Sequence, residues 1–139
     1  MSSINQSDSS CIDDHILAVL CETNSPDGSE TEAMVQLVTW ALSQFQKLQN
    51  INTTLAVSNL LPVPLIYIAG HNWHFLLAQN IGDDELLLIG GNPLGDTRSA
   101  SRILQLLAVI DRLAYWIKEE YLPWYKLIYC VYSQKTKSA

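Results

Sequence analysis

The sequence lacks the long apolar runs and the dense cysteines that mark membrane and disulfide-rich proteins. No window approaches the roughly 18 consecutive apolar residues of a bilayer-spanning helix. The N-terminal segment MSSINQSDSS has neither the basic nor the apolar region of a secretory signal. The three cysteines are odd in number and widely spaced, which indicates free thiols and supports neither disulfides nor a metal clip. We therefore expect a soluble, intracellular protein without a membrane partner, in the nucleus or the cytoplasm.

Positive charge is also scarce, with 8 Lys and Arg against 14 Asp and Glu and a net charge of -6. No Lys or Arg precedes Lys47. Because phosphate contacts need clustered basic residues, the charge does not support nucleic acid as a partner. An acidic segment suits a divalent cation such as Mg²⁺, or it is simply a solvated surface. The seven acids before Lys47 are Asp8, Asp13, Asp14, Glu22, Asp27, Glu30 and Glu32.

The length and composition fit one domain. A chain of 139 residues that is 48% hydrophobic can bury a sizeable core. Residues 1–11 have no hydrophobic period, which predicts a loop or disorder, and residues 133–139 form a polar tail that we expect to fray. The domain is therefore placed at residues 12–132.

The first half of this domain predicts a strand, a turn and a long helix. The short apolar run Ile16–Cys21 fits a strand buried on both faces. Turn-forming residues at 24–28 follow it. A helix is predicted at residues 29–49, because Ser29 and Glu32 form a capping box ahead of apolar residues at helical spacing.

The second half predicts an antiparallel meander and another long helix. Strands are expected at 65–69, 73–79 and 85–89, separated by short turns, with a loop at 90–95. A wide apolar stripe predicts a core helix at about 99–121, ended by Pro123. The candidate N-caps of this helix are Asp96, Thr97 and Ser99.

Glu22, Asn24 and Gln36 form the candidate site. Residues i and i+2 of a strand point to the same face, so Glu22 and Asn24 can converge on one ion. Gln36 lies at the edge of the helical apolar stripe and can face the end of the strand. Carboxylates are ligands that Mg²⁺ prefers, and a bound metal can activate water for phosphodiester attack. The alternative is a Glu and an Asn simply solvated at a turn.

Other candidates are weaker. His71 and His74 on an extended chain face apart and lack further ligands for zinc. Cys21 is expected to be a buried and inert thiol. Arg98 and Arg102 near the start of the second helix could meet phosphate, although a solvated surface is the simpler interpretation.

Five segments of the sequence occur in an order that is typical of a known family. They are SINQSD, VLCETN, EAMVQLVTWALSQF, LPVPLIYIAGHNWHFLL and LGDTRSASRILQLLAVIDRLAYWI. Together they resemble the PD-(D/E)XK nuclease-like domain found mostly in fungal proteins, and the resemblance covers residues 2–124. The family has segments that look like SINH-T-D, an I-E-T-K strand, a helix with A-x-x-Q-L and a Trp, a strand pair around G-H-x-W, and G-x-T-x-S before a helix.

The resemblance assigns roles to four residues. Glu22 matches the acidic residue of the E-x-K motif, Asn24 occupies its lysine position, and Gln36 matches the helix glutamine. Trp40 resembles the aromatic residue of the Q-x-x-x-Y pattern of recombination-type nucleases. The implied fold is α/β, a restriction-endonuclease-like core with a central mixed β-sheet flanked by two long helices. The implied ancestral activity is Mg²⁺-dependent hydrolysis of nucleic acid.

Two departures from the family pattern lower the expected activity. The lysine is lost, and the metal-binding Asp of the family would lie on a strand before Met1, so the chain is expected to be N-terminally truncated and degenerate. We expect weak or absent hydrolysis. A non-catalytic module that binds a protein partner, or a homo-oligomer, is the alternative. The acids that could replace the missing ligand beside Glu22 are Asp8, Asp13 and Asp14.

Overall fold

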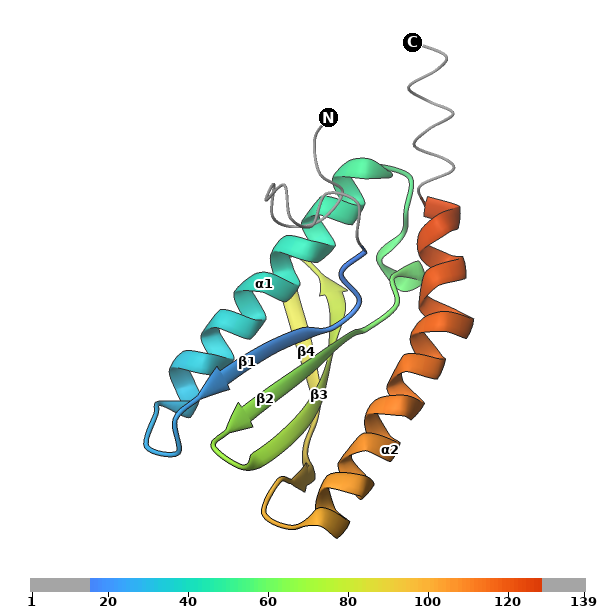
Figure 1. Cartoon of the computed structure of the whole chain (residues 1–139). Helices are drawn as coiled ribbons and strands as arrows, with labels where there is room; N and C mark the ends of the chain where they lie inside the picture. The colour runs from blue at the N-terminus through green and yellow to red at the C-terminus, as the bar shows by residue number, and fades with distance from the viewer. Residues whose placement is uncertain (1–15, 129–139) are drawn as a thin grey trace.

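A four-stranded mixed sheet lies between two long helices (Figure 1). The computed structural model describes residues 16–128. The sheet order is β1-β2-β3-β4, with β1 parallel to β2 and the other neighbours antiparallel. This architecture confirms the predicted α/β class and fits a restriction-endonuclease-like core. The elements are β1 (Leu20–Asn24), α1 (Glu30–Ile51), the 3-10 helix η1 (Val57–Asn59), β2 (Val63–Ala69), β3 (Asn72–Gly82), β4 (Glu85–Asp96), α2 (Ala100–Trp116) and the π-helical η2 (Ile117–Tyr121).

Helix α1 begins and packs as its sequence predicts. The Ser29 side chain accepts a hydrogen bond from the Glu32 backbone N–H at 3.2 Å, which satisfies one of the free donors at the helix start. The acidic first turn complements the helix dipole. The apolar stripe of α1 is completely or nearly completely buried, and it consists of Ala33, Leu37, Ala41, Phe45 and Leu48.

The alternation of side chains along β2 and β3 divides the sheet into two faces. Leu65 and Tyr67 belong to the core beneath α1, whereas Ile66 points to the opposite face, toward α2. On β3, Ala78 faces the α1 core and Phe75 faces α2. The site described below lies on the α1 face. None of the described helices is long and apolar enough to span a membrane.

The first strand begins later than predicted. Residues 16–19 are not paired, and β1 instead covers Leu20–Asn24 at the edge of the sheet, with Cys21 exposed. The register pairs Leu20 with Leu65, which sets the preceding residue opposite Pro64. Because proline has no N–H to donate to a ladder, this pairing does not extend toward the N-terminus. The shift places Glu22 and Asn24 inside the strand.

The prediction of a loop at residues 90–95 was also wrong, because these residues belong to β4. Phe75 pairs with Asn92 and Leu76 pairs with Gly90, so Gly91 is an extra residue in the ladder. Gly91 has a φ of 96°, a conformation that glycine adopts without strain. The loop-like composition therefore marks a bulged strand.

Helix α2 differs from the predicted core helix. Ser99 is its N-cap, but Leu106 is its only buried residue between Ala100 and Trp116. The apolar stripe of α2 was predicted to lie in the core, but part of it is exposed to solvent. Leu107, for example, is 53% exposed. Pro123 does not end the helix: the π-helical segment η2 precedes it, and helical structure continues to residue 128. A π turn changes the hydrogen-bond pattern where proline has no N–H to donate.

Candidate functional site

The end of β1 and the second turn of α1 bring Glu22 and Gln36 together. With the amide nitrogen of Gln36 facing the strand, it donates to both Glu22 carboxylate oxygens, at 3.1 Å to Oε1 and 3.3 Å to Oε2. The amide orientation is assigned from this hydrogen-bond network. Glu22 is half-buried and Gln36 is exposed. The predicted proximity of the strand carboxylate and the helix glutamine is confirmed.

The side chain of Asn24 is held by the backbone of the turn after β1, which is not the environment expected of a catalytic lysine. Its Nδ2 donates to the Ser29 carbonyl at 3.1 Å, and its Oδ1 accepts from the Ser25 N–H at 2.9 Å. A Cβ on Gly28 would lie 1.9 Å from Asn24 Oδ1, so only glycine leaves room for this side chain. The Asn24 carbonyl also accepts from the Gly70 N–H at 3.1 Å. Asn24 therefore anchors the β1–α1 turn with both ends of its amide.

Replacing Asn24 with lysine should destabilise the domain. Both side-chain hydrogen bonds of the turn would be lost, and we expect the free energy of unfolding to fall by about 1–2 kcal/mol. Urea unfolding followed by circular dichroism measures this change. Asn50→Lys, at an exposed position near the end of α1, adds the same charge and should change stability by less than about 0.5 kcal/mol. Equal stabilities of Asn24→Lys and the unsubstituted protein would contradict the anchoring role.

A polar row extends from Glu22 across the sheet on the α1 face. In the strand register Glu22 lies beside Tyr67, and Tyr67 lies beside His74. The rings of Tyr67 and His74 stack with centroids 5.9 Å apart. Tyr67 was not among the predicted site residues, and His74 was a candidate only as a zinc ligand. The identity of cross-strand neighbours depends on the strand register, and no local motif in the sequence specifies that register.

The other candidates have structural contacts. His71 Nδ1 lies 2.8 Å from Thr97 Oγ1, and its carbonyl accepts from the Thr97 N–H at 3.1 Å. These bonds join the β2–β3 turn to the start of α2. Asp96, which is buried, accepts hydrogen bonds from the Arg98 N–H at 2.9 Å and from the Arg102 guanidinium. The backbone bond from Arg98, followed by the Arg102 interactions, lowers the Asp96 pKa although burial opposes this.

Cys21 is exposed, and the prediction of a buried thiol was wrong. Partial burial of the thiol and the neighbouring Glu22 carboxylate raise its pKa. Since the thiolate is the nucleophilic form, this environment disfavours nucleophilic chemistry at Cys21.

The described residues do not form a dedicated Mg²⁺ site. Within residues 16–128 no group of three His, Cys, Asp or Glu side chains is close enough to share an ion. Glu22 is a single carboxylate, and Gln36 donates to both of its oxygens. The aspartates considered as a second ligand, Asp8, Asp13 and Asp14, lie outside the described residues. The donor set of the described residues therefore does not fit a metal cage.

Comparison with known proteins gives one family. The family model described as the PD-(D/E)XK nuclease superfamily matches residues 1–122. The match includes β1, α1 and the sheet, with all of the residues of the candidate site. No curated protein and no solved structure has a significant match to the chain.

Proposed function

Because the chain belongs to the PD-(D/E)XK nuclease superfamily, we propose that it keeps the nuclease fold while its phosphodiester hydrolysis is weak or absent. The observation that carries this proposal is the environment of Asn24. In this interpretation Asn24 fills the position of the motif lysine, yet its amide is held by Ser25 and Ser29 in the β1–α1 turn.

A lysine at this position would have a defined chemical role. Its charge would orient the attacking water and stabilise negative charge on the phosphate as it builds up. An asparagine amide donates and accepts hydrogen bonds but carries no charge. The net charge of -6 adds nothing to replace this attraction for a polyanion. Loss of the lysine therefore removes both transition-state stabilisation and substrate attraction.

Glu22 and Gln36 are the proposed remnant of the site. PD-(D/E)XK nucleases typically use divalent metals, and in this proposal Glu22 descends from a metal ligand. Gln36 donates to both of its oxygens, at 3.1 and 3.3 Å. A single carboxylate on the edge strand binds Mg²⁺ weakly on its own, because this ion usually takes one or two carboxylates together with substrate phosphates.

A calorimetric titration with Mg²⁺ and with Mn²⁺ tests the remnant site. We expect heats close to those of dilution at millimolar metal, both for the unsubstituted chain and for Glu22→Gln. Glu30→Gln is the matched control, since it removes an exposed carboxylate from the first turn of α1. Saturable binding that is lost in Glu22→Gln and kept in Glu30→Gln would contradict the proposal and support an intact metal site.

The second candidate function is a non-catalytic interaction module, with another protein or a second copy as the partner. The observation that favours it is apolar surface outside the site. Leu104 is 67% exposed on α2, and Tyr115 is 61% exposed on the same helix. Leu87 and Ile89 on the edge strand β4 are about half exposed as well. Saturable Glu22-dependent metal binding would favour an intact metal site over this module.

A further inference from the structure

Strand β4 is one edge of the sheet, and no other strand of residues 16–128 pairs with its outer side. Every residue from Leu87 to Pro93 is exposed. In an edge strand, every second residue directs its backbone N–H and C=O groups away from the sheet. These groups can donate and accept hydrogen bonds in the pattern of a further strand. The outer side of β4 is therefore suited to a protein segment in extended conformation.

The first part of β4 has a sequence that is unusual for an edge strand. Glu85 is followed by four apolar residues, and these four positions contain neither the charges nor the proline that commonly protect a sheet edge. Apolar residues at consecutive positions are typical of strands that are covered on both faces. Leu87 and Ile89 are nevertheless about half exposed, and Leu88 is 39% exposed. A strand of the interior type thus lies at the edge of the described sheet.

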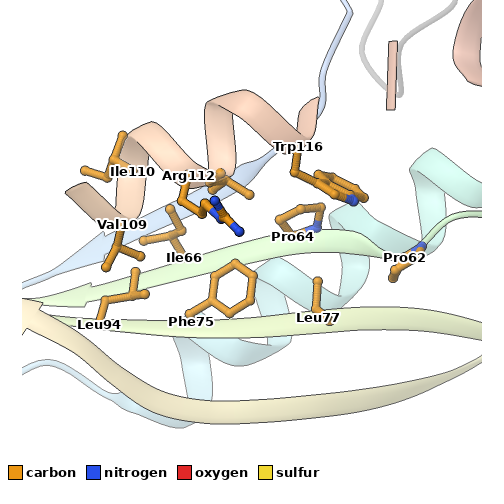
Figure 2. Close-up of a pocket in the computed structure, with 11 residues that line it drawn as sticks. Pro62, Pro64, Ile66, Phe75, Leu77, Leu94, Val109, Ile110, Arg112 and Trp116 are labelled. Atoms are coloured by element: carbon orange, nitrogen blue, oxygen red, sulfur yellow. The ribbon is translucent and has the colours of Figure 1, made fainter. Parts of the chain in front are cut away.

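The exposed side chains of this segment lie on both faces of the sheet. Leu88 pairs with Ala78, which belongs to the core beneath α1, so Leu88 is on the α1 face. Ile89 pairs with Leu77, which lines the groove between α2 and the sheet (Figure 2), so Ile89 is on the α2 face. Among the described residues, β4 contributes Leu94 to this groove, and Ile89 lies outside its lining. A strand added at the edge would therefore cover apolar surface that neither helix fully covers.

The charges near the segment favour an antiparallel partner over a parallel one. Asp83, Asp84 and Glu85 lie together in the turn before β4 and at its first residue. If two copies of β4 paired in parallel, these acids would lie beside their counterparts, and like charges on opposing positions are unfavourable. In an antiparallel pair of two copies, the two acidic groups lie at opposite ends of the ladder. The segment can therefore pair with itself in the antiparallel direction without this repulsion.

A two-fold axis beside Leu87 makes the segment complementary to itself. Opposing residues of an antiparallel ladder lie on the same face of the sheet, and a two-fold axis applies the same contacts to both copies. The axis sets Leu87 beside its own counterpart and Leu86 beside Leu88 of the second copy. The pairing ends before the bulge at Gly91, because a bulge bends the strand and disrupts the ladder.

We propose that the chain forms a two-fold symmetric dimer, in which residues 85–89 of two copies pair as antiparallel edge strands. This inference rests on the second candidate function, the interaction module, and it names the surface and the partner. A ladder this short buries less than the roughly 1,200–2,000 Å² of a stable interface, so the dimer is weak, with a dissociation constant on the order of 10–100 µM. Glu22 lies on β1, the opposite edge of the sheet, so the pairing leaves the nuclease-type site open.

Sedimentation velocity of the full chain, from about 5 µM to about 500 µM, tests the pairing by mass action. We expect a monomer at the lowest concentration and a dimer at the highest. Leu87→Glu places two like charges near the axis and close to Glu85, so it should raise the dissociation constant by more than about tenfold. An equimolar mixture of Leu87→Glu and Leu87→Lys should form the dimer again, because opposite charges then meet at the axis.

Leu104→Glu is the matched control for Leu87→Glu. Leu104 is 67% exposed on α2, so the control adds the same charge at an exposed leucine outside β4. It should change the dissociation constant by less than about twofold. If Leu87→Glu does not fold, Leu87→Thr keeps a residue that favours strands and should still raise the constant about threefold, because it removes apolar surface.

Several results would overturn the proposal. They are a monomer at every concentration, a dimer that the folded Leu87 variants leave unchanged, and a mixture of the two charge variants that remains monomeric. An equal loss of the dimer in Leu104→Glu would also contradict pairing through β4. Metal titration at Glu22 is an independent readout, so failure of the pairing and failure of the proposed function can be told apart.

Discussion

Replacing Phe45 with alanine should lower the free energy of unfolding by about 3–5 kcal/mol. Phe45 belongs to the apolar stripe of α1 and is completely buried in the core between α1 and the sheet. Truncation would remove the transfer free energy of the ring and leave a cavity. Since single domains are stable by about 5–15 kcal/mol, this is a large part of the total. Urea unfolding followed by far-ultraviolet circular dichroism provides the measurement.

Trp40→Ala is the matched control for Phe45→Ala. Trp40 is also an aromatic residue of α1, but it is 42% exposed. Its removal should lower stability by about 1 kcal/mol or less. Equal losses in the two variants would show that α1 does not pack on the sheet through the face that contains Phe45.

Raising the pH above about 10 should destabilise the domain through two tyrosines near the C-terminal end of the described chain. Burial raises the pKa of Tyr125 to about 12, and it raises the pKa of Tyr121 further, although a hydrogen bond with Gln44 opposes the shift. The unfolded chain ionises near pH 10 and thus binds fewer protons than the native state above that pH. The stabilisation is therefore complete below pH 10 and is lost as the pH rises toward 12. The expected slope is up to about 1.4 kcal/mol per pH unit for each group.

Chemical denaturation at pH 8, 9, 10 and 11 measures this slope. Tyr121 is 0% exposed, and its hydroxyl donates to the Leu17 carbonyl at 3.1 Å. Tyr121→Phe should lose about 1 kcal/mol at pH 8 from this hydrogen bond, and its alkaline slope should be smaller. Tyr115→Phe is the control, because Tyr115 is 61% exposed and should leave the slope unchanged. Identical slopes in the two variants would contradict a role for buried phenols.

The parts of the fold that the sequence predicted have strong local signals. A capping box at Ser29 and Glu32 with an apolar period of 3.6 residues was enough to place α1 within two residues of its observed end. Short turns predicted the antiparallel meander. The proximity of Glu22 and Gln36 followed from a strand end and a helix edge that a short turn connects. The resemblance added an interpretation of Asn24 that neither residue type nor spacing contains.

The parts that the sequence did not predict depend on tertiary contacts. The bulge at Gly91 looks like a loop in composition, since glycine favours both structures. The apolar stripe of α2 indicated a core helix, but periodicity gives the direction of a face and not its distance from the sheet. The turn contacts of Asn24 and the neighbourhood of Glu22, Tyr67 and His74 are products of chain register. These contacts determine which groups surround Glu22 and Asn24.

Cleavage of supercoiled plasmid DNA by the purified chain, with Mg²⁺ and with Mn²⁺, is the direct test of whether hydrolysis is lost. We expect no cleavage above the rate of a Glu22→Ala variant, because Asn24 is neutral and anchored in the turn, and Glu22 is the only carboxylate of the described site. Glu30→Ala is the control for general effects of a lost carboxylate. Metal-dependent cleavage that persists in Glu30→Ala and disappears in Glu22→Ala would contradict the proposed loss of activity and establish a working nuclease.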